Sequence, residues 1–339
     1  MLRLATIFLG FALCGALGCM QRTTSAEPDT PRADIGAEEL AEPGGFAADR
    51  DAPKDAVAVP FDGKRAMRYL EAICRIGARQ SGSEGMKKQQ EYLKKHFEDL
   101  GAKVEFQKFT ARQKSQKQPV EMANLIARWN PEAARRVILC SHYDTRPIAD
   151  QEPDRKKWFL PFVSANDGGS GVALMMELAH HMKDLKTQVG VDFVCFDGEE
   201  WIFESENDKY FFGSEHFADD YKKNKPKHKY IAAILFDMIA GKNAQFPVDR
   251  YSQFAAGPLV KDLWSIAAEQ KCKAFVPMVN DTEILDDHIA LNRGGIPAID
   301  IIDFSNTHWH KLSNVPENCA PEPMEQVARV VTVWLQRVK

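Results

Sequence analysis

Apolar and polar residues alternate along most of the chain with two different periods. Short apolar or alternating runs predict strands at residues 104–109, 124–129, 136–141, 191–196, 231–236 and 296–302. Apolar residues at helical spacing predict helices that follow the capping residues 81–83 as far as Leu100, at 170–184, from Ser214 onward, at 259–268 and at 323–338. Strands and helices therefore follow one another along the chain.

Near-continuous apolar strands that alternate with amphipathic helices are typical of α/β proteins, because such strands are buried on both faces of a sheet. We therefore predict one α/β domain over residues 61–339. Its central sheet is expected to be mixed and mostly parallel, with helices covering both faces. The sequence shows no internal repeat and no second linker in this range.

The first 19 residues have the pattern of a signal peptide, because the uncharged apolar run at 4–17 is too short to span a bilayer. The end of this run, Ala16-Leu17-Gly18-Cys19, resembles the lipobox of bacterial lipoproteins, which implies acylation of Cys19. Ordinary cleavage after residues 24–26 is the alternative. Either reading predicts an exported protein of the periplasm or cell envelope, which touches a membrane only through an N-terminal lipid.

Residues 20–60 are rich in Ala, Pro, Glu, Asp and Gly and predict a flexible acidic linker. The whole chain of 339 residues carries a net charge of −4, but residues 20–55 alone hold nine acidic and four basic side chains. The remaining 284 residues after Asp55 are therefore close to neutral. This balance argues against a nucleic-acid binder, which usually has a basic excess.

Ionisable side chains follow several predicted strands at the point where each strand ends. His142 and Asp144 follow the run at 136–141, and Glu199 and Glu200 follow the run at 191–196. Further along, the loop 166–171 contains Asp167, the strand at 231–236 is followed by Asp237, and the last strand is followed by His308 and His310. Ligands bind beyond the carboxyl ends of strands in open α/β sheets, so these side chains are expected to converge. Imidazoles and carboxylates together are the ligand set of a zinc site.

Each of these residues also has a structural interpretation when taken alone. Asp167 before two glycines fits a turn or a helix cap, and Glu199 with Glu200 fits a solvated loop. His142 and His310 are each compatible with a hydrogen-bonded structural histidine. Asp237 ends a continuous apolar run, so its carboxylate needs a partner.

Five short motifs stand out along the chain. They are Ser141-His142-Tyr143-Asp144, the glycine-rich segment 166–171, the segment 196–200, Asp286-Asp287-His288-Ile289 and Gly295-Ile296-Pro297. Together they resemble the zinc-dependent aminopeptidase family M28. Within this family the chain most resembles the glutaminyl cyclases, chiefly because Trp309 precedes His310 where peptidases commonly have tyrosine.

The resemblance implies roles for individual residues of this chain. It implies one zinc ion bound by Asp167, Glu200 and His310. It also implies that Glu199 is the general acid/base, that Asp237 is its hydrogen-bonded carboxylate partner, that Asp286 supports this pair and that Trp309 walls the substrate pocket. The implied activity is that of an aminoacyltransferase, the cyclisation of N-terminal glutamine in peptides or proteins to pyroglutamate with release of ammonia.

Two other functions remain open. His142, Asp167, Glu200, Asp237 and His310 together also resemble the five ligands of a two-zinc aminopeptidase that hydrolyses N-terminal residues. His142 and Asp144 are therefore candidates for a second metal or for support of the first. A non-catalytic domain that kept the fold for binding is the third reading.

The cysteines predict no disulfide framework. Five remain after Cys14 and Cys19, an odd number at irregular spacing. Ser141 and Val172 stand where animal members of the resembled family have a cysteine pair near the site, so no disulfide is expected there.

Overall fold

A computed structural model describes residues 56–339. The predicted signal peptide, Cys19 and nearly all of the acidic linker lie outside these described residues. The helices are α1 (Gly63–Arg75), α2 (Glu84–Asp99), α3 (Gly169–Leu178), α4 (Phe212–Asn224), α5 (Arg250–Glu269), α6 (Asp287–Arg293) and α7 (Pro321–Arg337), with short 3-10 turns η2 (Arg155–Lys157), η3 (Ala179–His181) and η4 (Pro316–Asn318). None of these helices is long and apolar enough to cross a membrane.

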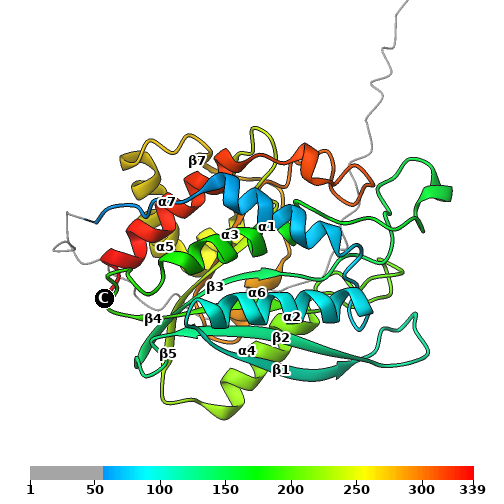
Figure 1. Cartoon of the computed structure of the whole chain (residues 1–339), viewed down its shortest axis with the longest axis horizontal. Coiled ribbons are helices and arrows are strands. Elements are labelled where there is room, and N and C mark those ends of the chain that lie inside the picture. Colours follow the sequence, from blue (N-terminus) through cyan, green and yellow to red (C-terminus); the bar gives the residue numbers. More distant parts are fainter. Residues whose placement is uncertain (1–55) are drawn as a thin grey trace, which may run out of the picture. The chain divides into compact units, whose positions relative to one another are not determined.

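Six strands form the central sheet (Figure 1). They are β1 (Lys103–Ala111), β2 (Val120–Trp129), β3 (Arg135–His142), β4 (Gly190–Phe196), β5 (Lys229–Asp237) and β8 (Ala298–Ile302), in the spatial order β1-β2-β4-β3-β5-β8. The pairs β4–β3, β3–β5 and β5–β8 are parallel, whereas β1–β2 and β2–β4 are antiparallel. The predicted mixed, mostly parallel sheet is confirmed. Strands β6 (Phe246–Val248) and β7 (Phe275–Val279) make a separate parallel pair.

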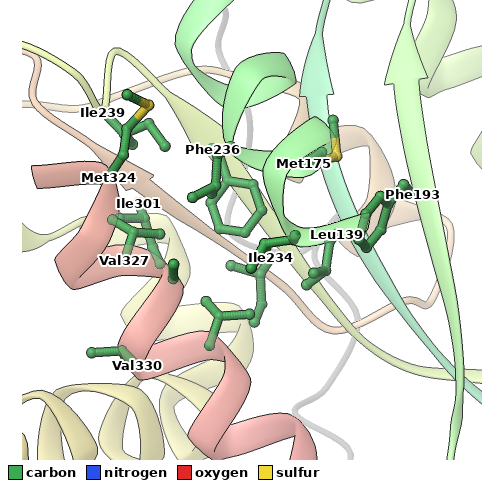
Figure 2. Packing of buried hydrophobic residues seen from close by; sticks show 14 of the residues in the cluster. Leu139, Met175, Phe193, Ile234, Phe236, Ile239, Ile301, Met324, Val327 and Val330 are labelled. Atoms are coloured by element: carbon green, nitrogen blue, oxygen red, sulfur yellow. The ribbon is translucent and has the colours of Figure 1, made fainter. Parts of the chain in front are cut away.

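Helices cover both faces of this sheet, as predicted. Residues of α1, α2, α3, α5 and α7 share one apolar core with the sheet, and residues of α4 and α6 share another. Figure 2 shows part of the first core, to which Met175 of α3, Val327 of α7 and Ile234 and Phe236 of β5 all belong. Burial of apolar side chains on both faces explains why the central strands read as continuous apolar runs.

Helix α3 packs unusually close to the strands that carry the candidate site. All ten of its residues are buried, and it begins with Gly169, Ser170 and Gly171. A Cβ atom at Gly171 would lie 2.4 Å from the Ser141 hydroxyl oxygen and 2.5 Å from the carbonyl oxygen of Phe236. Only glycine therefore fits at this position, between β3 and β5.

Two predicted helices have different bounds in the structure. The helix expected at 170–184 ends at Leu178, and the chain then continues as a 3-10 turn. The helix expected at 259–268 begins earlier, at Arg250, and bends at Ala256 before Pro258. Proline lacks an N–H and clashes with the preceding turn, so it interrupts the sequence pattern of a helix that continues on both sides. Helices α1 and α6 and strands β6 and β7 were not predicted.

The five cysteines of the described chain are all buried and unpaired. They are Cys74, Cys140, Cys195, Cys272 and Cys319. Ser141 and Val172 are also buried, Ser141 donating from its hydroxyl to the His142 carbonyl oxygen at 2.9 Å.

Candidate active site and metal centre

The carboxyl ends of β3, β4 and β5 bring the predicted side chains together. His142 ends β3, Glu199 and Glu200 follow β4, and Asp237 ends β5. With Asp167 before α3 and His310 after β8, they form three overlapping groups whose ligand atoms lie within 4.8 Å of one another. The groups are Asp167–Glu200–His310, His142–Asp167–Asp237 and His142–Glu199–Glu200.

The first group has the composition of a zinc site. Glu200 Oε1 lies 2.5 Å from His310 Nε2, and Asp167 Oδ2 lies 3.8 Å from the same nitrogen. All three residues are buried. One nitrogen and two carboxylates on converging elements match the three protein ligands that a catalytic zinc site uses, with one position left for water or substrate.

Unpaired oxygen atoms provide a test of this assignment. Asp167 Oδ2 and Glu200 Oε2 are buried, and neither accepts a hydrogen bond within the described chain. A buried carboxylate oxygen without a partner is costly unless a cation neutralises it. The residues present therefore fit a divalent metal.

Unusual backbone conformations hold two of these residues in place. Gly168, directly after Asp167, has φ +70°, and a Cβ atom there would lie 2.6 Å from the His142 ring. His310 itself has φ +50°, in the left-handed region that is uncommon for residues other than glycine. Its carbonyl oxygen accepts a hydrogen bond from the Gln151 N–H at 3.2 Å.

His142 and Asp237 form the second group with Asp167. His142 Nε2 lies 3.2 Å from Asp167 Oδ1 and 3.4 Å from Asp237 Oδ1. Asp237 Oδ1 accepts the backbone N–H groups of Gly168 and Met238, at 3.3 Å and 2.9 Å. Asp167 is shared between the first two groups, as a bridging carboxylate would be in a two-metal site.

The Asp144 carboxylate accepts hydrogen bonds from the backbone of both adjacent glutamates. Its Oδ1 accepts the N–H of Glu199 at 3.2 Å, and its Oδ2 accepts the N–H of Glu200 at 3.0 Å. Asp144 belongs to none of the three candidate metal groups of residues 56–339. One fully buried carboxylate therefore orients the two adjacent glutamates through their backbone, which accounts for its place in the sequence motif.

Glu199 and Asp286 lie in surroundings that favour their neutral forms. Burial raises the pKa of Glu199 well above its usual range, and the nearby Glu200 carboxylate raises it further. Burial likewise raises the pKa of Asp286, and Asp237 adds to that effect. Asp286 also caps α6 by accepting the Asp287 N–H at 2.6 Å. A carboxyl group whose pKa is raised by its surroundings suits acid/base chemistry.

An apolar cluster lies beside these polar groups. The buried side chains of Met238, Ile284 and Ile302 pack with half-buried Phe304 and Trp309. The Trp309 ring lies 4.0 Å from the His310 ring, centroid to centroid, at an interplanar angle of 31°. This cluster forms an apolar wall next to the candidate metal group. Trp201, by contrast, is buried against Phe203 and Phe212.

Sequence reasoning missed several residues of this site. Met238 and Ile284 were not singled out, although each stands next to a predicted acid, one residue after Asp237 and two before Asp286. Arg146 and Asp150 were also missed, and both contact residues of the metal group. The only sequence signal for this pair is the spacing of an arginine four residues before an aspartate. The signal is weak because neither residue lies in a predicted helix or strand. His308 was a candidate together with His310, but its ring Nδ1 lies 2.8 Å from the Ser313 hydroxyl oxygen.

Comparisons with known proteins agree with this geometry. The model of peptidase family M28 matches residues 124–335. A mouse protein named glutaminyl-peptide cyclotransferase-like protein is 27% identical over 282 residues, which cover 76% of this chain and 71% of the mouse protein.

Two solved structures extend the likeness to three dimensions. The glutaminyl cyclase of Fimbriiglobus ruber is 51% identical with a TM-score of 0.82, over 83% of this chain and 97% of that one. A Zn-dependent exopeptidase from Parabacteroides distasonis is 30% identical with a TM-score of 0.76, over 82% of this chain and 99% of that one.

Proposed function

Because the chain belongs to peptidase family M28 and to its glutaminyl cyclase branch, we propose that it cyclises N-terminal glutamine of peptides or proteins to pyroglutamate and releases ammonia. The observation that carries this proposal is the 51% identity with a glutaminyl cyclase over 97% of the chain in its solved structure. The converging carboxylates and histidines of the site supply the groups that the reaction needs.

One zinc ion is proposed to bind Asp167, Glu200 and His310. The metal would supply Lewis-acid polarisation of the substrate's γ-amide carbonyl and charge stabilisation as the ring closes. The unpaired oxygens of Asp167 and Glu200 support this ligand set. Asp144 contributes by holding the backbone of Glu200, so that the carboxylate is oriented before the metal arrives.

Glu199 is proposed to move the protons. In the reaction, the α-nitrogen of glutamine forms a bond to the γ-carbon, and the bond between that carbon and the amide nitrogen breaks. The α-ammonium gives up two protons. Glu199 would accept one and later donate it to the leaving nitrogen, so that ammonia departs, and the other would pass to solvent. The raised pKa of Glu199 supports this role, because burial makes the carboxylate a stronger base than an ordinary glutamate.

Asp237, Asp286 and Trp309 are proposed to shape the reaction chamber. Asp237 faces His142, and burial beside Asp237 favours the protonated form of Asp286. The apolar wall around Trp309 would cover the carbon skeleton of the glutamine and exclude water, which would otherwise compete with the α-amine.

A two-zinc aminopeptidase is the second candidate function. The observation that favours it is the group His142–Asp167–Asp237, which shares Asp167 with the first group and adds His142 and Asp237 to it. A second metal there would activate a water molecule for hydrolysis of the N-terminal peptide bond. The cyclase needs no attacking water and therefore no second metal ion to activate one. The number of bound metal ions thus distinguishes the two functions.

Export and lipidation are proposed from the sequence only. The apolar run at 4–17 and the lipobox-like segment ending at Cys19 support a lipid anchor on the cell envelope. Metabolic labelling with a fatty acid tests it. Label that is lost in Cys19→Ala supports the anchor, and an unlabelled parent protein contradicts it.

Ammonia release from glutamine-initiated peptides tests the proposed activity. The purified zinc-loaded protein should release one ammonia per peptide and leave a product with a blocked N-terminus. The same peptide with an acetylated α-amine is the matched control, because it keeps the γ-amide and lacks the nucleophile. No ammonia from the free-amine peptide would contradict the proposal.

A further inference from the structure

His310 presents its two ring nitrogens to different partners. Nε2 faces Glu200 and Asp167 in the proposed metal group, and Nδ1 lies 2.9 Å from Asp150 Oδ1, a close charge contact whose angle lies outside that of a hydrogen bond. Both His310 and Asp150 are largely enclosed, with side-chain exposures of 4% and 11%. A carboxylate at this distance behind a buried imidazole selects which nitrogen carries the proton.

The segment that carries Asp150 also holds the backbone of His310. The N–H of Gln151, the next residue, donates to the His310 carbonyl oxygen at 3.2 Å. His310 has φ +50°, a conformation that costs free energy for a residue with a Cβ atom. Asp150 therefore contacts the side chain of His310, and Gln151 holds its main chain. These two consecutive residues keep the histidine in an otherwise unfavourable conformation.

Arg146 in turn holds Asp150. Its Nε and Nη2 atoms donate to Asp150 Oδ2 at 3.1 Å and 2.7 Å, in a forked arrangement. The guanidinium is buried, and Nη1 lies 3.9 Å from Glu200 Oε1. One cation therefore stands between the partner of His310 and a second proposed metal ligand.

The same guanidinium reaches the loop that follows the glutamates. Arg146 Nη2 donates to the Ser205 hydroxyl at 3.0 Å and to the Tyr210 hydroxyl at 3.2 Å. Ser205 also donates to Asp150 Oδ2 at 3.3 Å. The loop between Glu200 and α4 is thus connected to His310 through charged, enclosed groups. None of these contacts involves the proposed acid/base Glu199.

We propose that Arg146 and Asp150 are a positioning pair that orients His310 Nε2 toward the metal. The inference rests on the proposed zinc site. The Asp150 carboxylate, 2.9 Å from Nδ1, favours the tautomer that carries the proton on Nδ1, so that the lone pair of Nε2 faces the ion. Arg146 keeps Asp150 in place, because two of its nitrogens donate to Asp150 Oδ2 and restrain the aspartate from turning toward the metal itself. Neither residue touches the reacting atoms.

Zinc affinity tests this role without any measurement of catalysis. We compare full-length protein with Asp150→Asn, which keeps the side-chain size and loses the charge, and with Arg146→Lys, which keeps the charge and loses the fork. Asp154→Asn is the matched control, because this exposed aspartate lies on the same segment and only caps η2. Competition with a chelator gives the zinc Kd, and thermal unfolding with and without zinc gives the shift in Tm that zinc causes.

Asp150→Asn should bind zinc about 10- to 100-fold more weakly, with a smaller loss for Arg146→Lys and none for Asp154→Asn. The shift in Tm that zinc causes should shrink in the same order. If Asp150→Asn does not fold, Arg146→Lys carries the comparison.

A merely structural role predicts a different result. It would lower the Tm of the metal-free variants and leave their zinc Kd within about twofold of the parent, and this result would overturn the inference. A parent protein that binds no zinc would overturn the proposed function itself, and the inference with it. The two failures are therefore distinguishable.

Discussion

Glu200 and His310 meet side chain to side chain, with Oε1 2.5 Å from Nε2, although 110 residues separate them in the sequence. When His310 is protonated and Glu200 is ionised, this contact is an ion pair. Burial and the Arg146 guanidinium would lower the pKa of His310. The carboxylates of Glu200 and Asp150 outweigh both and raise the pKa to about 8.

The pH dependence of zinc binding follows from this pKa. Below pH 8 zinc must displace a proton from His310, so the apparent affinity should fall about tenfold per pH unit as the pH drops from 8 to 6. Chelator competition at a series of pH values measures it. An affinity that does not change between pH 6 and pH 8 would contradict the assignment of His310 as a ligand.

The raised pKa of His310 also makes the stability of the metal-free protein depend on pH. Whereas zinc binding weakens as the pH falls, the metal-free fold is most stabilised by His310 at low pH. A histidine whose folded pKa exceeds its ordinary value of 6.5 stabilises the fold fully below pH 6.5. That contribution is lost as the pH rises through 8. The Tm of metal-free protein should therefore fall from pH 6.5 to pH 8.5, and added zinc should reduce this fall.

Replacement of Glu199 by glutamine should abolish most of the activity. Glu199→Gln keeps the size of the side chain and removes the group that accepts and donates protons, so kcat should fall about a hundred- to ten-thousandfold. Zinc content should stay at the parent value, because Glu199 is not among the proposed ligands. Glu206→Gln, an exposed change in the following loop, is the control. A Glu199→Gln protein that loses its zinc would instead make Glu199 a metal ligand, as the group His142–Glu199–Glu200 allows.

Truncation of Trp309 should weaken substrate binding. Trp309→Ala removes the half-buried ring from the apolar wall, and the loss of ~1.4 kcal/mol of apolar contact corresponds to a roughly tenfold higher KM. Trp309→Phe should restore most of it. Phe159→Ala is a suitable control, since that ring is 79% exposed. Unchanged kinetics in Trp309→Ala would exclude Trp309 from the substrate pocket.

Substitution of Gly171 tests the close packing of α3 behind the site. Gly171→Ala would place a methyl group within 2.5 Å of the Phe236 carbonyl oxygen and should destabilise the protein by about 1–3 kcal/mol. Gly257→Ala in α5 is the matched control, because its nearest neighbour is the end of the Gln253 side chain at 3.1 Å. Urea unfolding compares the two. Equal stabilities would show that α3 can move away from β3 and β5 without cost.

The sequence predicts the parts of this molecule that depend on short-range pattern. Strands β3, β4 and β5 are buried on both faces, so each appears as an apolar run with its site residue at or just beyond the end. His142, Glu200 and Asp237 could be placed on one edge of the sheet for that reason. The mixed sheet and the helical layers follow from the same alternation.

Other parts depend on contacts that sequence does not show. Arg146 and Asp150 lie in a loop without periodicity, and their function appears only when the chain folds His310 against them. Helix α5 was only half predicted because Pro258 interrupts its pattern, although packing keeps the helix on both sides of the bend. Strand β6 has only three residues, and β7 exposes most of its five, so neither gives an apolar run or an alternating pattern.

Zinc stoichiometry measured together with product analysis tests the central claim most directly. The purified protein is assayed for metal per chain, and peptides beginning with Gln, Leu or Ala are analysed for ammonia and for free amino acids. The account predicts one zinc per chain, ammonia from the Gln peptide only, and no free amino acids. Two zinc ions per chain with free leucine or alanine released would contradict it and establish the aminopeptidase.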